Sequence, residues 1–198
     1  MKRRRSADSP RRSAARSGPA GPGSGDRVRS GFRPTSGVVR DALFNILGGR
    51  LDLAGARVLD LFAGSGALGL EALRRGASFA VFVERDHALA GAIRARGQRA
   101  QWTDRIEVWR RDAVPAVHEL ARRSRTFDLI VLDPPYGGQW IPKVLRAIVA
   151  DGILAPGGIV VAEGHWRDRP DAAGLVLVRE ARYGETVLWF FAQEKEGG

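Results

Sequence analysis

The sequence predicts an α/β fold, with a mostly parallel, doubly wound sheet of seven strands that ends in an antiparallel hairpin. Short apolar β-like runs alternate with helical segments from residue 57 to residue 163, and this alternation is typical of a parallel sheet with helices on both faces. The last two β-like runs, 175–182 and 186–192, are joined by only three residues. Because a parallel crossover needs a much longer connection, these two runs should form a hairpin.

The individual elements follow from hydrophobic spacing and from helix-end signals. An extended entry at residues 33–36 ends in a capping position, and a first helix then runs until Gly48-Gly49. Its apolar residues recur at helical spacing and are Val39, Leu43, Ile46 and Leu47. Further helices are predicted at 68–75, 87–99, 114–121 and 141–150, and the strands of the parallel part at 57–62, 79–84, 106–110, 127–133 and 159–163.

The composition indicates one globular domain, since the 198 residues are 44% apolar and 27% charged. No apolar run approaches the roughly 18–20 residues of a membrane helix, so we expect no membrane association. The chain has no cysteine, which excludes disulfide scaffolds, thiolate nucleophiles and zinc ribbons and fits a reducing cytosol. The histidines His87, His118 and His165 lack metal-ligand spacing. We therefore expect a cytoplasmic, monomeric protein without a metal.

Positive charge is concentrated at the N-terminus. Residues 1–29 contribute +7 of the net +10, from Lys2 and eight arginines against Asp8 and Asp26. Such a segment cannot bury enough surface to fold, so we expect a disordered tail at residues 1–29 and a folded domain at residues 30–198. The tail is either an arm that binds a polyanion such as nucleic acid or a solubilising extension. Its Arg and Ser content also resembles a transit peptide, although Pro and Gly disfavour the amphipathic helix of such peptides.

A glycine-rich loop follows the first predicted strand. Gly64, Gly66 and Gly69 fit the pattern G-x-G-x-x-G. In that pattern the first glycine permits a tight turn, the second lets a ligand approach the backbone, and the third lets the helix pack on the strand. Glu84 ends the next strand, 20 residues after Gly64, where a carboxylate can accept both hydroxyls of a ribose. Together these features predict a cofactor that contains a nucleoside.

The loop alone does not distinguish NAD from S-adenosylmethionine, because both present an adenosine. Asp60, just before the loop, would repel a pyrophosphate and suits the cationic methionine end of S-adenosylmethionine, whose product is S-adenosylhomocysteine. Asp112, after the third strand, could accept a hydrogen bond from the adenine amino group or cap the following helix, and the two roles are compatible. No Gly-Lys-Ser/Thr follows the loop, which excludes a phosphate-binding P-loop.

The fourth strand ends in Asp133-Pro134-Pro135-Tyr136. Because Pro134 has no N–H, the carbonyls of Asp133 and Pro134 and the Asp133 carboxylate can all accept hydrogen bonds from one NH2 group. Tyr136 offers a ring on which a planar base can stack. An aromatic amine is a poor nucleophile, and acceptors on its protons would direct its lone pair toward a sulfonium methyl group. The segment therefore predicts methyl transfer to an exocyclic amine or to an amide.

The segment at 133–136 after a glycine loop resembles the amino-methyltransferases that act on adenine N6, guanine N2 or glutamine N5. Three further segments resemble the RsmD family within this class, and they are Arg33-Pro34-Thr35 with residues 39–47, the loop at 59–72, and the hairpin turn at 183–186. The resemblance covers roughly residues 32–191 and implies a Rossmann-like fold of the class I methyltransferases that depend on S-adenosylmethionine. The sequence departs from the family in its long Arg-rich N-terminus, where a short hairpin is usual. It also has Asp41 where Glu is more common, and residues 87–102 match weakly.

This resemblance implies methylation of guanine 966 at N2 in 16S ribosomal RNA, either as naked RNA or within the 30S subunit. It implies that Asp133, Pro134 and Tyr136 bind and orient the guanine. The expected cofactor-binding residues are Asp60, Gly64, Ser65, Gly66, Glu84, Arg85, Asp112 and Ala113. The segment that would cover the cofactor and face RNA contains Arg33, Thr35 and Arg40, and a plain surface position is an equal alternative for Arg40. Solvated helix faces are expected for Arg74, Arg75, Arg94, Arg96 and Arg99.

Other functions remain open at this point. Adenine N6 in DNA and glutamine N5 in a protein are alternative targets of the same chemistry. A separate DNA-recognition region would have little room, however, and an enzyme for glutamine would favour Asn at position 133. An NAD-dependent oxidoreductase needs a hydride-site acid or base, and no Tyr-x-x-x-Lys or paired His is present. A non-catalytic RNA-binding protein is disfavoured by the intact segment from Asp133 to Tyr136.

Overall fold

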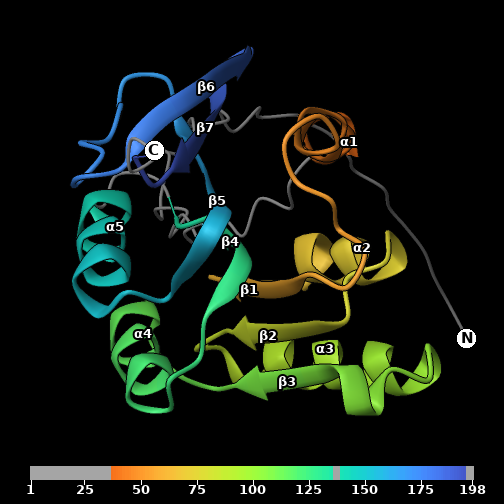
Figure 1. Ribbon diagram of the computed structural model, residues 1–198. Helices are drawn as coiled ribbons and strands as arrows, with labels where there is room; N and C mark the ends of the chain where they lie inside the picture. The colour runs from red at the N-terminus through yellow and green to blue at the C-terminus, as the bar shows by residue number, and fades with distance from the viewer. Residues whose placement is uncertain (1–36, 136–138, 195–198) are drawn as a thin grey trace, which may run out of the picture. The chain divides into compact units, whose positions relative to one another are not determined.

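The computed structural model describes residues 37–135 and 139–194, which contain a seven-stranded sheet in the order β3-β2-β1-β4-β5-β7-β6 (Figure 1). The strands are β1 (Arg57–Leu61), β2 (Phe79–Val83), β3 (Ile106–Trp109), β4 (Phe127–Leu132), β5 (Leu154–His165), β6 (Val176–Tyr183) and β7 (Thr186–Ala192). Strands β1 to β5 pair in parallel, whereas β7 is antiparallel to both β5 and β6. The predicted mostly parallel sheet with a C-terminal antiparallel hairpin is therefore confirmed.

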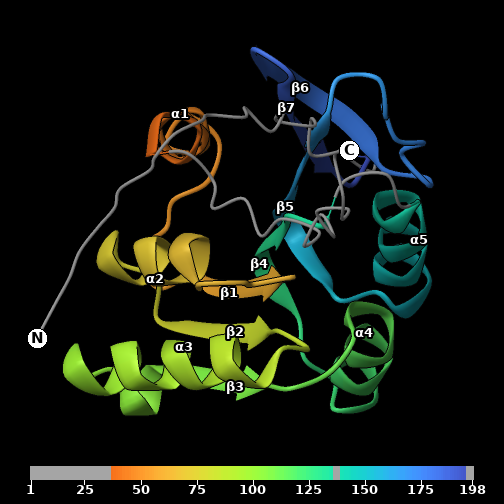
Figure 2. The same ribbon diagram turned by 180° about the vertical axis from the view of Figure 1, so that it is seen from behind.

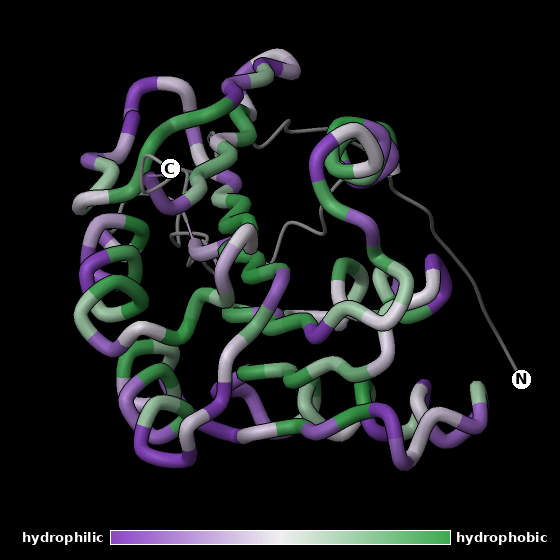
Figure 3. Tube along the Cα trace, viewed as in Figure 1, coloured by the Kyte–Doolittle hydropathy of each residue, from purple (hydrophilic) through white to green (hydrophobic). Residues whose placement is uncertain are grey.

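Helices cover both faces of the sheet, as Figures 1 and 2 show. On one face lie α1 (Gly37–Leu47), α2 (Ala67–Arg74) and α3 (His87–Arg99), and on the other α4 (Ala113–Arg122) and α5 (Trp140–Asp151). A short 3-10 turn, η1 (Thr103–Arg105), leads into β3. Strands covered on both sides need apolar residues on both faces, and Figure 3 shows hydrophobic residues along much of the sheet. None of the described helices is both long and apolar enough to cross a membrane.

The central strand β1 shows how side chains are divided between the two cores. Leu59 and Leu61 pack in the core under α4 and α5, whereas Val58 packs in the core under α1, α2 and α3. Completely burying such a side chain stabilises the fold by about 1.5–3 kcal/mol relative to leaving it exposed. Successive side chains of a strand alternate between faces, so Asp60 lies on the side of α2. The sheet thereby places a carboxyl group beneath the helix that follows the glycine loop.

Strands β1 and β4 are neighbours although they are far apart in sequence. Their register runs from Val58 beside Leu129 to Leu61 beside Leu132. At the amino end of the pair, the backbone N–H of Arg57 donates to the Asp128 carboxylate at 2.7 Å, across 71 residues of sequence. At the other end, the residues that follow the two strands emerge side by side.

Within the described residues, every predicted helix and strand is present, and most of their ends differ only slightly from the prediction. The start of β5 differs more. This strand begins at Leu154 rather than at residue 159, because Leu154 already pairs with Phe127 before Ile159 pairs with Leu129. The residues between these two pairs form an irregularity in the ladder, in which Gly157 has a positive φ of 75°. The short turn η1 was not predicted. The tail at residues 1–29 and the extended entry at residues 33–36 lie outside the described residues.

Candidate active site

The predicted site residues gather at the carboxyl edge of the parallel strands, around the junction of β1 and β4. Ligands of open α/β sheets bind where the strand order reverses, and here the chain moves outward from β1 in one direction through β2 and β3, and in the other through β4 and β5. The glycine loop follows β1, and Asp133 follows β4. The backbone N–H of Asp133 lies 3.5 Å from the Leu61 carbonyl. The two motifs found in the sequence are thus neighbours in space.

The glycine loop turns sharply into α2. Gly64 and Gly66 have positive φ angles of 54° and 75°, which side chains disfavour, and the Gly66 N–H donates to the Ala63 carbonyl at 2.6 Å. A Cβ atom on Gly69 would lie only 2.3 Å from the Phe82 ring on β2. The third glycine therefore permits close packing of α2 on the sheet, as predicted. The loop also leaves backbone N–H groups at the N-terminus of α2 for a polar ligand.

Glu84 holds the glycine loop in place from the end of β2. Its Oε2 atom accepts from the Gly64 N–H at 2.8 Å, and its Oε1 atom accepts from the Asp86 N–H at 2.8 Å. A carboxylate offers about four acceptor positions, so both oxygens retain capacity for ribose hydroxyls. The residue is buried, which makes these hydrogen bonds stronger than in water. The structure thus adds a loop-fixing role to the predicted cofactor role of Glu84.

Asp60 is a buried acid with a strongly raised pKa. Its Oδ2 atom accepts from the Gly69 N–H at 2.9 Å, and only 2% of the residue is exposed. The pKa of Asp60 is raised from 3.8 to about 8, chiefly by burial and in part by the negative charges of Asp133 and Glu84, against the lowering effect of the Gly69 hydrogen bond. A cation placed here would relieve that repulsion. The site therefore fits the ammonium group of a methionine moiety, and the described residues contain no cluster suited to a metal ion.

The remaining predicted cofactor residues line the same edge. Asp112 stands at the N-terminus of α4 but its side chain makes no capping hydrogen bond, so the predicted capping role is wrong and the exposed carboxylate is available. Ala113 is buried in the first turn of α4, and Arg85 is exposed after β2. The Ser65 carbonyl accepts from the Arg96 side chain at 2.6 Å. Arg33, Thr35 and Tyr136 lie outside the described residues.

Several arginines expected on solvated helix faces also make specific contacts. Arg96 supports the glycine loop through Ser65, and Arg94 donates to the Val108 carbonyl at 2.8 Å. Arg75 pairs with Glu71 at 2.8 Å and covers the Phe44 ring at 4.7 Å from its centroid. All three arginines are exposed, as predicted, and these contacts add to that surface position.

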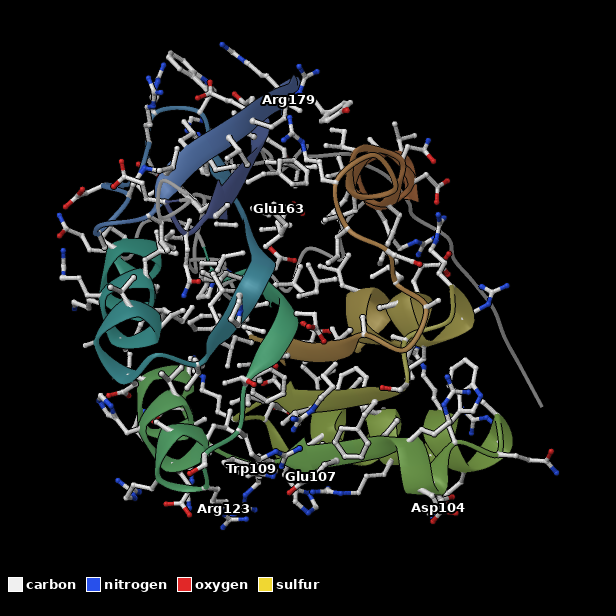
Figure 4. The ribbon with its side chains drawn as sticks, viewed as in Figure 1. Asp104, Glu107, Trp109, Arg123, Glu163 and Arg179 are labelled. Atoms are coloured by element: carbon white, nitrogen blue, oxygen red, sulfur yellow. The ribbon has the colours of Figure 1, made fainter. Side chains whose placement is uncertain are left out.

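Glu163 provides a second carboxyl group beside Asp133, and the sequence analysis did not predict it as a site residue. Leu132 pairs with Ala162, so the residues that follow them, Asp133 and Glu163, occupy neighbouring positions at the ends of β4 and β5. Only 6% of Glu163 is exposed, and Figure 4 shows it projecting from β5. An apolar run ending in an acid was the same signal that identified Glu84. It could have found Glu163 if the pairing of β4 with β5 had been used.

Arg40 on α1 is partly exposed but has one buried polar atom. Its side chain is 34% exposed, yet its Nε atom is buried and has no hydrogen-bond partner among the described residues. The Asp41 Oδ1 atom is 3.9 Å away, beyond hydrogen-bonding distance. A buried cationic donor without an acceptor is costly, so this atom is suited to an anionic ligand.

Phe62 and Trp140 form an aromatic corner beside Asp133. Phe62 follows β1 with a positive φ of 62°, an unusual conformation for a non-glycine residue that is frequent at functional sites. Its ring meets Trp140 at the start of α5, edge to face, with centroids 6.0 Å apart. The Lys143 Nζ atom lies 5.5 Å from the centroid of Trp140. Neither aromatic residue was predicted to belong to the site.

The fold order, the glycine loop with Glu84, and the acceptor segment after β4 are together the features of a methyltransferase that uses S-adenosylmethionine. The chain belongs to the family described as Conserved hypothetical protein 95, whose model matches residues 27–192. Relatives of this chain include RsmD-like and YlbH-like methylases.

Individual relatives agree with this assignment. YlbH of Bacillus subtilis (strain 168), provisionally named an rRNA methyltransferase, is 40% identical over 157 residues, which cover 78% of this chain and 84% of YlbH. Ribosomal RNA small subunit methyltransferase D of Escherichia coli (strain K12) is 29% identical over 176 residues, which cover 84% of this chain and 82% of that protein. A solved structure of a conserved hypothetical protein from Streptococcus pyogenes is 33% identical, with a TM-score of 0.72, and covers 81% of this chain and 98% of that one.

Proposed function

We propose that this protein methylates the exocyclic N2 amine of a guanine in 16S ribosomal RNA of the small subunit. The observation that carries the proposal is the position of Asp133 and Pro134, directly beside the glycine loop at the junction of β1 and β4. The name of the E. coli relative, Ribosomal RNA small subunit methyltransferase D, supports the class of substrate. The sequence resemblance described above supports guanine N2 within that class.

The residues present fit S-adenosylmethionine, which when bound supplies an electrophilic methyl group on a sulfonium. Glu84 would accept from the ribose hydroxyls while it holds Gly64 in place. Asp60 would face the ammonium group, whose positive charge favours the ionised form of this acid and so lowers its raised pKa. Asp112 would accept from the adenine amino group.

The residues after β4 would orient the amine. The Asp133 carboxylate and the carbonyls of Asp133 and Pro134 accept hydrogen bonds from the two N–H groups and thereby turn the nitrogen lone pair toward the methyl carbon. Accepting the methyl group would make the nitrogen positively charged and acidic, and Asp133 would receive its proton. Positioning and electrostatics at a fixed site contribute most of the rate in such a transfer.

Two neighbouring carboxyl groups favour guanine over adenine as the target. The Watson–Crick edge of guanine presents the N1–H and N2–H donors side by side, whereas that of adenine presents only its amino group beside an acceptor nitrogen. Asp133 and Glu163 occupy adjacent strand positions at this edge. A carboxylate accepts from guanine N1–H and would repel the lone pair of adenine N1.

The experiment that tests the proposal compares tritiated methyl incorporation into 16S rRNA, 30S particles, DNA and protein under identical conditions. We expect incorporation into rRNA or 30S particles, with the label recovered as N2-methylguanine after nucleoside digestion. Asp133→Ala serves as the matched control for background. Label recovered in N6-methyladenine or in glutamine would overturn the proposal and assign one of the alternative targets.

A further inference from the structure

Trp166 is an exposed aromatic residue at the same edge of the sheet as the candidate active site. It follows directly on His165, the last residue of β5, and 39% of it is accessible to solvent. In the described part of the chain it is the only aromatic residue among the large exposed apolar side chains. Three valines, Val38, Val149 and Val176, are exposed as well, so the significance of Trp166 lies in its aromatic ring and in the cations that surround it.

Two arginines lie against the indole ring of Trp166. The guanidinium carbons of Arg167 and Arg182 are 4.9 Å and 4.6 Å from the ring centroid, within the range of a cation–π interaction. Neither arginine forms an ion pair with a described carboxylate, whereas Arg169 in the same segment pairs with Glu180. The two guanidinium groups are therefore available for an anion such as a phosphate.

The backbone fixes this group of three residues relative to the active site. The Trp166 N–H donates to the Glu185 carbonyl at 3.0 Å, which ties the end of β5 to the turn between β6 and β7. The Arg182 Nε atom donates to the Gly184 carbonyl at 2.8 Å in that turn. Strand β5 is the immediate neighbour of β4, whose end carries Asp133, and Trp166 comes three residues after Glu163, the β5 residue level with Asp133.

We propose that Trp166, Arg167 and Arg182 form a platform for an unpaired nucleotide that flanks the target guanine in the substrate RNA. This inference rests on the proposed function. A target base must leave its stack to reach Asp133, and enzymes of this kind also bind the flanking nucleotides. An unstacked base packs well on an exposed indole or on a guanidinium plane, and its phosphate is neutralised by the two arginines. The aromatic and the cationic groups thus match one nucleotide.

The test is equilibrium binding of the full-length protein, loaded with S-adenosylhomocysteine, to a 16S rRNA fragment over a range of salt concentrations. Trp166→Ala should bind about tenfold more weakly, whereas Trp166→Phe should stay within about threefold of the parent. Arg167→Ala and Arg182→Ala should each reduce the slope of log affinity against log salt by about 1. Arg122→Ala is the matched control, because Arg122 is exposed at the far end of α4 and already paired with Glu119, and its slope should not change.

The outcomes separate this inference from the proposed function. If the parent methylates rRNA and Trp166→Ala binds the fragment as tightly as the parent, the platform is wrong and the proposed function stands. If the parent methylates no RNA, the proposed function itself fails. Weaker binding to 30S particles with unchanged binding to the fragment would mean a ribosomal-protein contact and would also overturn the platform. If Trp166→Ala loses S-adenosylhomocysteine binding or folds poorly, the test uses Arg167→Gln and Arg182→Gln instead. An unchanged slope of log affinity against log salt in both variants would then overturn the platform.

Discussion

Glu84 Oε2 accepts a hydrogen bond from the backbone N–H of Gly64 at 2.8 Å. The acid at the end of β2 therefore shapes the loop that follows β1, in addition to its proposed role in binding the ribose of the cofactor. Residues that build a loop and also bind a ligand produce two separable losses when mutated, one in stability and one in affinity.

Replacing Glu84 should separate these two losses. Glu84→Ala leaves the buried Gly64 N–H without its acceptor and should lower the free energy of unfolding by about 1–3 kcal/mol. It should also weaken S-adenosylhomocysteine binding by about 1–3 kcal/mol, because charge-assisted hydrogen bonds to the ribose are lost. Glu84→Gln keeps one carbonyl acceptor for Gly64, so it should lose affinity with a smaller loss of stability. Urea unfolding and calorimetry measure the two effects; equal losses of stability in both variants would contradict the loop-fixing role.

The raised pKa of Asp60 predicts a pH-dependent stability. With a pKa of about 8 in the folded protein and an ordinary value of 3.8, the folded chain holds a proton between these values that the unfolded chain has released. The stabilising effect of this proton is complete below about pH 4 and is lost as the pH rises through 8, at up to about 1.4 kcal/mol per unit. The free energy of unfolding of Asp60→Asn, relative to the parent, should therefore increase from pH 5 to pH 8 and then level off.

The same variant should bind the cofactor less well. An amide does not attract the ammonium group, so Asp60→Asn should weaken S-adenosylhomocysteine binding by about 1.5–3 kcal/mol. Urea denaturation at pH 5, 6.5, 8 and 9 measures the pH dependence of stability, and calorimetry at pH 8 measures the loss of cofactor affinity. A stability difference that is the same at all four pH values would show that Asp60 titrates normally.

Gly69 should not tolerate a methyl group. A Cβ atom would lie 2.3 Å from the Phe82 ring, which is fully buried, so Gly69→Ala should destabilise the fold by about 1–3 kcal/mol through overpacking. Gly91→Ala on α3 is the matched control. No atom lies within 4 Å of its added Cβ, and this change should stabilise the helix by about 0.5–1 kcal/mol. Thermal unfolding of both variants should shift in opposite directions, and a shift in the same direction would argue against close packing of α2 on β2.

Asp133 should be needed for methyl transfer more than for cofactor binding. Asp133→Ala removes the carboxylate but leaves the Pro134 carbonyl, so single-turnover methylation should fall by about 10²–10³-fold, as for the loss of one preorganised electrostatic group. Asp133→Asn should be milder, because its amide oxygen still accepts a hydrogen bond. Affinity for S-adenosylhomocysteine serves as the internal control. Methylation by Asp133→Ala at the parent rate would mean that another residue orients the amine.

Deleting residues 1–29 should affect RNA binding alone. These residues carry a charge of +7, so their removal should weaken binding to rRNA and flatten its dependence on salt. Cofactor affinity and the unfolding temperature should not change. An unchanged salt slope would identify the segment as a solubilising extension.

The sequence predicted this fold well because local signals and the parallel topology agree. Helix α3 has the predicted bounds, 87–99, since Asp86 provides a capping side chain that accepts from the Leu89 N–H at 2.9 Å. The start of β5 was missed because its first residue is fixed by pairing with Phe127 rather than by its own neighbours in sequence.

The candidate site was predicted where a motif lies within one segment, and missed where it depends on strand pairing. The glycine loop and Asp133 are each continuous in sequence. Glu163 and Trp166 could be recognised as candidate site residues only once β5 was known to lie beside β4. The contact of Arg96 with Ser65 likewise joins residues that are 31 apart in sequence. Such long-range contacts leave no periodic signal.

The separation of β1 from β4 has a consequence for synthesis of the chain. At about 5–20 residues per second, the 71 residues between Arg57 and Asp128 take roughly 4–14 s to translate. During this interval the nascent chain can pair β1 with β2 and so form the Gly64–Glu84 contact, while the other edge of β1 still lacks its partner. The residues proposed to hold the cofactor are thus synthesised before the proposed acceptor segment. A chain stalled before β4 would present an apolar strand edge open to aggregation or to a chaperone.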